Sequence, residues 1–243
     1  MSHYLGIVTA YAAAAVLVWL AALLHPESIP AAREYSPKHR VMQLGLFVLA
    51  MIGAAVLQLL ENQGLLLPDS DPLDAALNQL LIFMPLVIYL IAQRSPAAAM
   101  MPVNGLLRSL AGGVALALIA LAAYLSGRGA WEDLPDLAAR MLSVDRADRF
   151  AQLFFLDLAL GTLLALLSGG WSRKLALIVL GAIVLLVHIG VARLAGIGFE
   201  AIGGVLLGSA VAFGLLSAVI YTRNIVWFWP VHAMLGVLLL LVD

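Results

Sequence analysis

The stretch LGIVTAYAAAAVLVWLAALL, residues 5–24, decides the class of fold, because it is apolar along its length and carries no charged side chain. A helix of about 20 apolar residues crosses a hydrocarbon core of about 30 Å, so this stretch predicts a membrane-spanning helix. It is too long for the apolar region of a cleavable signal, and no Lys or Arg precedes it. We therefore expect a retained first span.

Seven further blocks of the same kind follow along the chain. The predicted spans are residues 5–24, 41–60, 75–93, 106–126, 150–168, 175–193, 198–221 and 225–242. Only 11% of the 243 residues are charged and 64% are hydrophobic, whereas about a quarter of a typical soluble domain is charged. We predict an all-α polytopic protein of about eight transmembrane helices with short loops, forming one domain over residues 1–243 in a lipid bilayer.

Charge and cysteine content exclude several classes of function. The formal net charge is −1, so the chain has no basic field with which to hold nucleic acid. It contains no cysteine, which excludes disulfides, thiolate metal sites and cysteine nucleophiles.

A longer polar segment, residues 127–149, separates the first four predicted spans (1–126) from the last four (150–243). Its apolar side chains recur at helical spacing, at Leu134, Leu137, Ala138, Met141 and Leu142. This pattern predicts an amphipathic helix lying in the membrane interface. Such a helix can be a lid that guides substrate, or a simple connector.

Basic residues indicate the orientation of the chain. With both termini on one side of the membrane, eight Lys and Arg fall on the opposite side and five on the terminal side. Cytoplasmic loops carry the excess of basic residues, so both termini are predicted to be non-cytoplasmic. We expect an integral protein of a bacterial inner membrane.

Three ionisable side chains lie well inside predicted spans: Asp157, His188 and His232. Measured from the outer ends of their spans, Asp157 and His188 lie about 10 Å and about 8 Å deep, so these two can meet. His232 lies about 10 Å from the cytoplasmic side, at a different depth. One carboxylate and two imidazoles can bind a divalent metal or relay a proton. Alternatively, each histidine bonds a neighbouring backbone carbonyl.

Other side chains in the spans predict packing and position. Ala10 and Ala14, four residues apart, predict a close approach between helices. Trp227, Phe228 and Trp229 begin the last predicted span and are typical of an aromatic belt at the cytoplasmic interface.

The order of short motifs in the second half of the chain matches a known pattern. The motifs are Gly161-Thr162-Leu163-Leu164, Val187-His188-Ile189-Gly190, Gly203-Gly204, Tyr221-Thr222-Arg223-Asn224 and Pro230-Val231-His232. From Phe155 to Val242 the chain thus resembles the CAAX protease and bacteriocin-processing (CPBP) family of intramembrane proteases. That family carries EExxxR, usually followed by Gly-Leu-Leu, then FxxxH, a Gly-rich helix and HxxxN.

The chain departs from the family pattern at the positions that carry its chemistry. Phe155 and Leu156 stand where the glutamate pair belongs, with Asp157 just after them, and Leu160 stands where the arginine belongs. Val184 and Gly236 replace the phenylalanine of FxxxH and the asparagine of HxxxN. In the family, the glutamates and histidines are thought to activate water for peptide cleavage. The resemblance therefore implies a member that has lost its general base.

Three functions are compatible with these residues. The first is a catalytically degenerate CPBP-like protein, acting as an accessory or scaffold subunit that contacts membrane protein partners through its transmembrane helix faces. The second is an active intramembrane metal-dependent protease or hydrolase, with Asp157 as base and His188 and His232 as metal or oxyanion partners. In the third, His188 or His232 is an axial ligand of haem or a pigment, with room provided by small neighbours such as Gly190 and Gly236.

Overall fold

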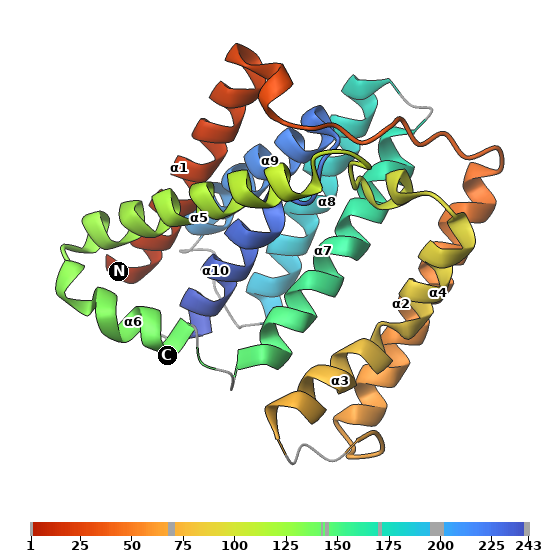
Figure 1. Ribbon diagram of the computed structural model, residues 1–243, viewed down its shortest axis with the longest axis horizontal. Helices are drawn as coiled ribbons and strands as arrows, with labels where there is room; N and C mark the ends of the chain where they lie inside the picture. Colours follow the sequence, from red (N-terminus) through yellow and green to blue (C-terminus); the bar gives the residue numbers. More distant parts are fainter. Residues whose placement is uncertain are drawn as a thin grey trace.

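The computed structural model describes residues 2–67, 71–141, 143, 146–169, 172–194 and 202–240. Over these ranges the chain forms helices joined by turns and contains no strand (Figure 1). The α-helices and the short 3-10 helices, labelled η, are α1 (Ser2–Leu24), η1 (Pro26–Ser28), α2 (Arg40–Glu61), α3 (Pro72–Ile82), α4 (Met84–Gln93), η2 (Pro96–Ala99), α5 (Leu106–Arg128), η3 (Trp131–Asp133), α6 (Leu134–Met141), α7 (Ala147–Ser168), α8 (Arg173–Leu194), α9 (Ile202–Thr222) and α10 (Phe228–Leu240).

Six of these helices, α1, α2, α5, α7, α8 and α9, are long and apolar enough to cross a membrane. The pair α3 and α4 adds a seventh if it counts as one bent span. The described part of α10 has 13 residues, and a helix of that length rises only about 20 Å. The all-helical class and an apolar, membrane-spanning character are therefore confirmed, while the count of eight spans stays a prediction.

The third predicted span, residues 75–93, is not one straight helix. It breaks at Phe83 into α3 and α4, which are bent by 53°. Pro85 lies in the first turn of α4, and a proline supplies no amide hydrogen to the preceding helical turn. The predicted span of residues 75–93 is therefore a bent pair of helices, because the backbone hydrogen bond that would continue α3 through this point cannot form.

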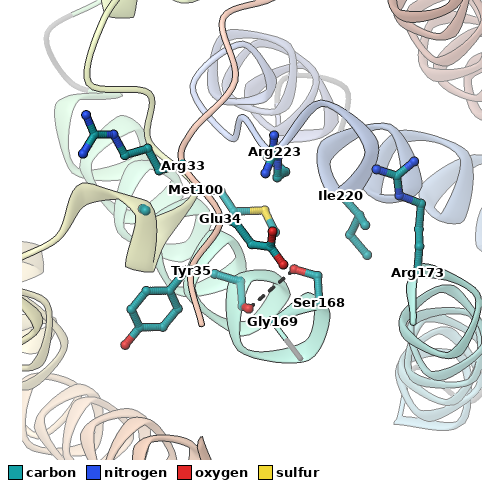
Figure 2. Close-up of a pocket in the computed structure, with 11 residues that line it drawn as sticks. Arg33, Glu34, Tyr35, Met100, Ser168, Gly169, Arg173, Ile220 and Arg223 are labelled. Atoms are coloured by element: carbon teal, nitrogen blue, oxygen red, sulfur yellow. Dashed lines mark hydrogen bonds between the residues drawn. The ribbon is translucent and has the colours of Figure 1, made fainter. Parts of the chain in front are cut away.

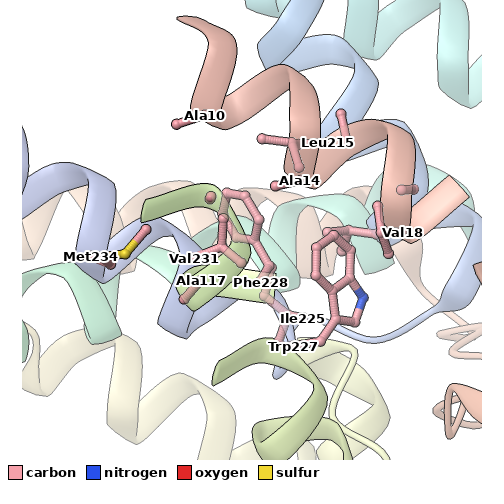
Figure 3. Close-up of a cluster of buried hydrophobic side chains, with 14 of the residues drawn as sticks. Ala10, Ala14, Val18, Ala117, Leu215, Ile225, Trp227, Phe228, Val231 and Met234 are labelled. Carbon is pink, nitrogen blue, oxygen red and sulfur yellow. The ribbon is translucent and has the colours of Figure 1, made fainter. Parts of the chain in front are cut away.

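The main hydrophobic core lies among α1, α5, α9 and α10, and Figure 3 shows part of it. Ala10 and Ala14 of α1 are fully buried, as their spacing predicts. Farther along α1, the Trp19 indole Nε1 donates a hydrogen bond of 3.0 Å to the Gly214 carbonyl of α9. The helix α1 thus packs into the core through small residues and is joined to α9 by one hydrogen bond.

A second, smaller core joins α2, α3 and α4 to α7. In Figure 1, α7 lies between this group and the rest of the bundle. Leu164 and Ala165 of α7 belong to the main core, whereas Ala159 and Leu166 belong to the smaller one. One helix therefore contributes to both cores, on different faces.

The turn before α10 enters the bundle instead of lying on its surface. Asn224 is fully buried there, and its side-chain amide donates to the Pro30 carbonyl (2.6 Å) and to Ser109 Oγ (2.8 Å). Its side-chain oxygen accepts from the Val226 amide at 2.9 Å. These bonds join the turn to the segment after α1 and to α5. The helix α10 follows this turn and begins at Phe228, three residues later than predicted.

The predicted amphipathic connector contains the short helix α6. Leu134 and Leu137 pack against the edge of the main core. This part of the predicted apolar face therefore contacts the protein. Leu142, also part of that predicted face, lies outside the described residues.

Candidate functional site

Asp157 is the most deeply buried charged side chain in the described part of the protein. It lies ten residues after Ala147, near the middle of α7, and only 2% of its surface is exposed. Its Oδ1 atom lies 2.7 Å from Nδ1 of His232 in α10. A buried carboxyl group needs such a partner, because its transfer out of water is otherwise costly. The pair directly links α7 to α10.

His232 approaches Asp157 from the first turns of α10. Its ring stacks on Phe228, with ring centroids 5.2 Å apart and planes inclined by 24°. The two partners differ in exposure, because the His232 side chain is 28% exposed and that of Asp157 only 3%. The imidazole of His232 can therefore contact further groups at the surface, whereas the carboxyl of Asp157 is almost enclosed.

A cavity of about 210 Å³ lies beside the pair. Its wall is almost wholly apolar and is made by Met101, Leu106, Leu110, Phe154, Asp157, Leu158, Ile225, Val226 and Trp229. Leu106 and Phe154 are 46% and 36% exposed on the outside of the helices. Two of the side chains around the cavity therefore also reach the outer surface of the helices.

Two residues around this cavity each have a buried polar atom without a hydrogen-bond partner. The atoms are Oδ2 of Asp157 and Nε1 of Trp229. The first accepts hydrogen bonds when the group is ionised, and the second can only donate. The surface of the cavity is almost wholly apolar, so neither atom faces into it.

His188 is not part of this arrangement. Its Nδ1 atom lies 2.9 Å from the Val184 carbonyl, one turn earlier in α8, and α8 packs chiefly against α9. In the structure Asp157 meets His232, and His188, which the depth estimate allowed to meet Asp157, lies elsewhere. Both helix starts differ from the predicted ones, because α7 begins three residues earlier, at Ala147, and α10 three residues later, at Phe228. Depths counted from the predicted starts therefore do not decide which side chains meet.

A metal centre built from all three predicted residues would need them to converge. Within the described ranges, no group of three His, Asp or Glu side chains is placed to hold a metal ion. Asp157 and His232 alone supply two donors, whereas catalytic zinc sites use three protein ligands. Axial ligation of haem or a pigment by His188 or His232 stays a prediction.

The aromatic residues before and in α10 were predicted to lie at the membrane interface, but two of them are inside the bundle. Trp227 is 2% exposed and Phe228 5% exposed, and the Trp227 indole Nε1 donates to Thr222 Oγ1 at 3.1 Å. The buried turn at Asn224 carries them inward. Trp229, whose role at the cavity the sequence did not indicate, lies next to them and stacks edge-on against Phe154 at 5.3 Å.

A second hollow, of about 230 Å³, lies where the loops after α1, α7 and α9 meet (Figure 2). Arg33, Arg173 and Arg223 line it together with Glu34 and Ser168. The Arg173 guanidinium lies 5.0 Å from the centre of the Tyr221 ring. The charge pattern assigned all three arginines to the same side of the membrane, and the structure places them at one end of the bundle. With three guanidinium groups and one carboxylate among its lining side chains, this hollow is basic.

Comparison with known proteins finds no protein family, no curated protein and no solved structure that matches this chain.

Proposed function

We propose that this protein is a non-catalytic, CPBP-like membrane subunit, which acts as an accessory or scaffold component of a membrane assembly. The proposal rests on Phe155 and Leu156, which stand where the resemblance expects the glutamate pair. Phe155 stacks on Phe83, at the break between α3 and α4, with ring centroids 5.4 Å apart, and Leu156 is 40% exposed on the outside of α7. One position serves packing and the other faces lipid, so neither supplies a general base.

The geometry of Asp157 and His232 supports a structural role for the pair. The hydrogen bond joins two helices that also pack on each other, and His188 bonds its own helix. A paired carboxyl and imidazole can hold two helices in register without taking part in a reaction.

The outer face of α8 supports contact with partners in the plane of the membrane. Ile178, Leu186 and Val187 of this helix are 69%, 67% and 56% exposed, and all are apolar. The polar joints between the helices are short, so the transmembrane faces provide most of the area that a partner could bury. Contacts of this kind depend on packing between helices.

The test is site-specific photo-crosslinking of the full chain in native membranes. A photoreactive residue at Ile178 or Leu186 is expected to yield a stoichiometric adduct with one discrete membrane protein. The same residue at Leu180, which faces the core at 2% exposure, is the matched control and should yield only adducts within the chain. A monodisperse single subunit, purified under conditions that keep other complexes intact and free of such adducts, contradicts the proposal.

A second candidate function, an intramembrane hydrolase, is favoured by one observation. Oδ2 of Asp157 has no hydrogen-bond partner, and a general base needs a free lone pair with which to take a proton from water. In this version His232 orients Asp157, and His188 takes no part. Asp157→Asn is expected to abolish turnover of a membrane-embedded peptide while the protein stays folded, whereas retained cleavage rules this version out.

A further inference from the structure

The basic hollow at the end of the bundle gathers positive charge that no acid among the described residues pairs with. Its lining includes three guanidinium groups and one carboxylate, which leave a formal charge of +2. The guanidinium groups belong to Arg33, Arg173 and Arg223, and the carboxylate belongs to Glu34. In the described part of the chain, none of these three arginines forms a salt bridge with an Asp or Glu. Like charges held together without a counter-charge repel one another, so this arrangement favours an anion between them.

The backbone around the hollow is fixed by contacts between segments that are far apart in the sequence. The Ala32 amide donates a hydrogen bond of 2.9 Å to the Arg223 carbonyl, which joins the loop after α1 to the turn after α9. A Cβ atom on Gly169 would overlap the Tyr35 carbonyl oxygen, so the same loop lies directly on the end of α7. The arginines therefore meet because this loop runs along the ends of the helices (Figure 1).

Two of the three arginines are held in particular conformations. Arg223 has a φ of +50°, in the left-handed region that residues with a side chain seldom adopt. Strained backbone of this kind is typical of ligand sites, where the surrounding structure maintains it, and the next residue, Asn224, is fully buried. The Arg173 guanidinium lies 5.0 Å from the centre of the Tyr221 ring, a cation–π contact that restricts where this side chain points.

The charge and size of the hollow indicate a phosphate monoester. Guanidinium groups bind phosphate and carboxylate oxygens through paired N–H donors. A phosphate monoester carries a charge of about −1.5 to −2 at neutral pH, which balances the charge of the hollow, whereas a carboxylate or a phosphodiester carries a single negative charge. The volume of about 230 Å³ is many times the roughly 15 Å³ that a cavity needs to hold one water. A phosphate group and part of the molecule that bears it therefore fit.

We propose that the basic hollow binds the terminal phosphate group of a phosphate monoester, which is either the headgroup of a lipid or a soluble compound. The N–H groups of Arg33, Arg173 and Arg223 donate to the phosphate oxygens. Glu34 opposes binding, because its carboxylate repels the same anion. The site is independent of whether the protein serves as a subunit of an assembly.

The experiment measures the binding of two probes to the full chain in nanodiscs. Inorganic phosphate is titrated by calorimetry, at constant ionic strength, into the chain in phosphatidylcholine nanodiscs. In parallel, nanodiscs with equal minor fractions of phosphatidic acid and phosphatidylglycerol show, by native mass spectrometry, which lipid the released chain retains. Retention of phosphatidic acid in preference to phosphatidylglycerol identifies a lipid headgroup as the source. Saturable binding of phosphate without that preference identifies a soluble compound.

Variants of exposed residues provide the matched test. Arg173→Gln removes one set of charged donors and should weaken binding of the probe about tenfold. Arg108→Gln removes the same charge on the same predicted side of the membrane, but Arg108 lies on α5 and does not line the hollow, so binding should be unchanged. Glu34→Gln removes the repelling carboxylate and should tighten binding about threefold. All three side chains are exposed, so these variants should fold like the wild type.

Three results would each overturn the proposal. In the first, neither inorganic phosphate nor phosphatidic acid binds. In the second, Arg108→Gln weakens binding as much as Arg173→Gln, which would show a general effect of charge instead of a site. In the third, Glu34→Gln leaves binding unchanged or weakens it.

Discussion

The pairing of Asp157 with His232 predicts an unequal cost for removing its two members. His232→Phe keeps a ring stacked on Phe228 but leaves the Asp157 carboxyl, only 3% exposed, without a partner for either oxygen. The lost hydrogen bond and the unpaired buried group together cost about 3 kcal/mol of unfolding free energy. Asp157→Leu instead leaves an imidazole that is 28% exposed and can reach other groups, so we expect a cost of about 1 kcal/mol.

The double variant, in which Asp157 and His232 are both replaced, tests whether the two costs are coupled. Replacing both members by apolar side chains removes the unpaired group altogether, so its stability should lie within about 1 kcal/mol of the wild type. If the two substitutions acted independently, their costs would sum to about 4 kcal/mol. The double-mutant cycle should therefore show a coupling energy of about 3 kcal/mol between Asp157 and His232.

Equilibrium unfolding of the full chain in mixed micelles measures each term of this cycle. His188→Phe is the matched control, because its imidazole bonds only a carbonyl of its own helix, and it should cost under about 1 kcal/mol. If His232→Phe proves no more destabilising than this control, or if the double variant loses the full sum, then the pair does not join the helices as argued.

Three other predictions rest on features outside this pair, and the same unfolding assay measures them. Asn224→Ala removes three hydrogen bonds from a fully buried turn, so it should cost about 3 kcal/mol. A cost near zero would show that the turn is not fixed by this side chain. Gly161→Ala would place a Cβ atom 2.5 Å from the Ala99 carbonyl oxygen and should cost about 2 kcal/mol. The control Gly190→Ala, with no atom nearby, should be neutral or stabilising by up to about 1 kcal/mol. Equal effects of the two variants would contradict the close approach of Gly161 to Ala99. Burial raises the pKa of the Tyr35 hydroxyl, so the stability this group contributes is complete below about pH 10 and is lost as the pH rises further; Tyr35→Phe should lack this alkaline loss.

The class of fold could be predicted from the sequence because membrane-spanning helices consist of long runs of apolar residues. The boundaries of α1 and α2 follow directly from such runs, and so does the burial of Ala10 and Ala14. The break at Phe83 was missed although Pro85 was visible, because a proline in an apolar run is also compatible with a continuous kinked span. Local composition therefore identifies which segments cross the membrane better than it identifies how straight they are.

The candidate site was predicted only in part, because its geometry depends on contacts distant in sequence. Asp157, His188 and His232 stood out as polar groups in apolar surroundings, but which of them meet depends on where each helix begins. The start of α10 follows the buried Asn224 turn, whose hydrogen bonds reach residues in the first half of the chain. Trp229 gave no signal at all, because a tryptophan near the end of a span is the common mark of an interface.

The hydrogen bond from Trp19 to Gly214 has a consequence for how the chain is made. Its two residues are separated by 195 positions, and ribosomes add about 5–20 residues per second. The part of the α1 surface that meets α9 therefore stays without its protein partner for about 10–40 s after its own synthesis, whereas α5, which α1 also packs against, is made sooner. During that interval lipid tails or an insertion factor can cover the part of α1 around Trp19.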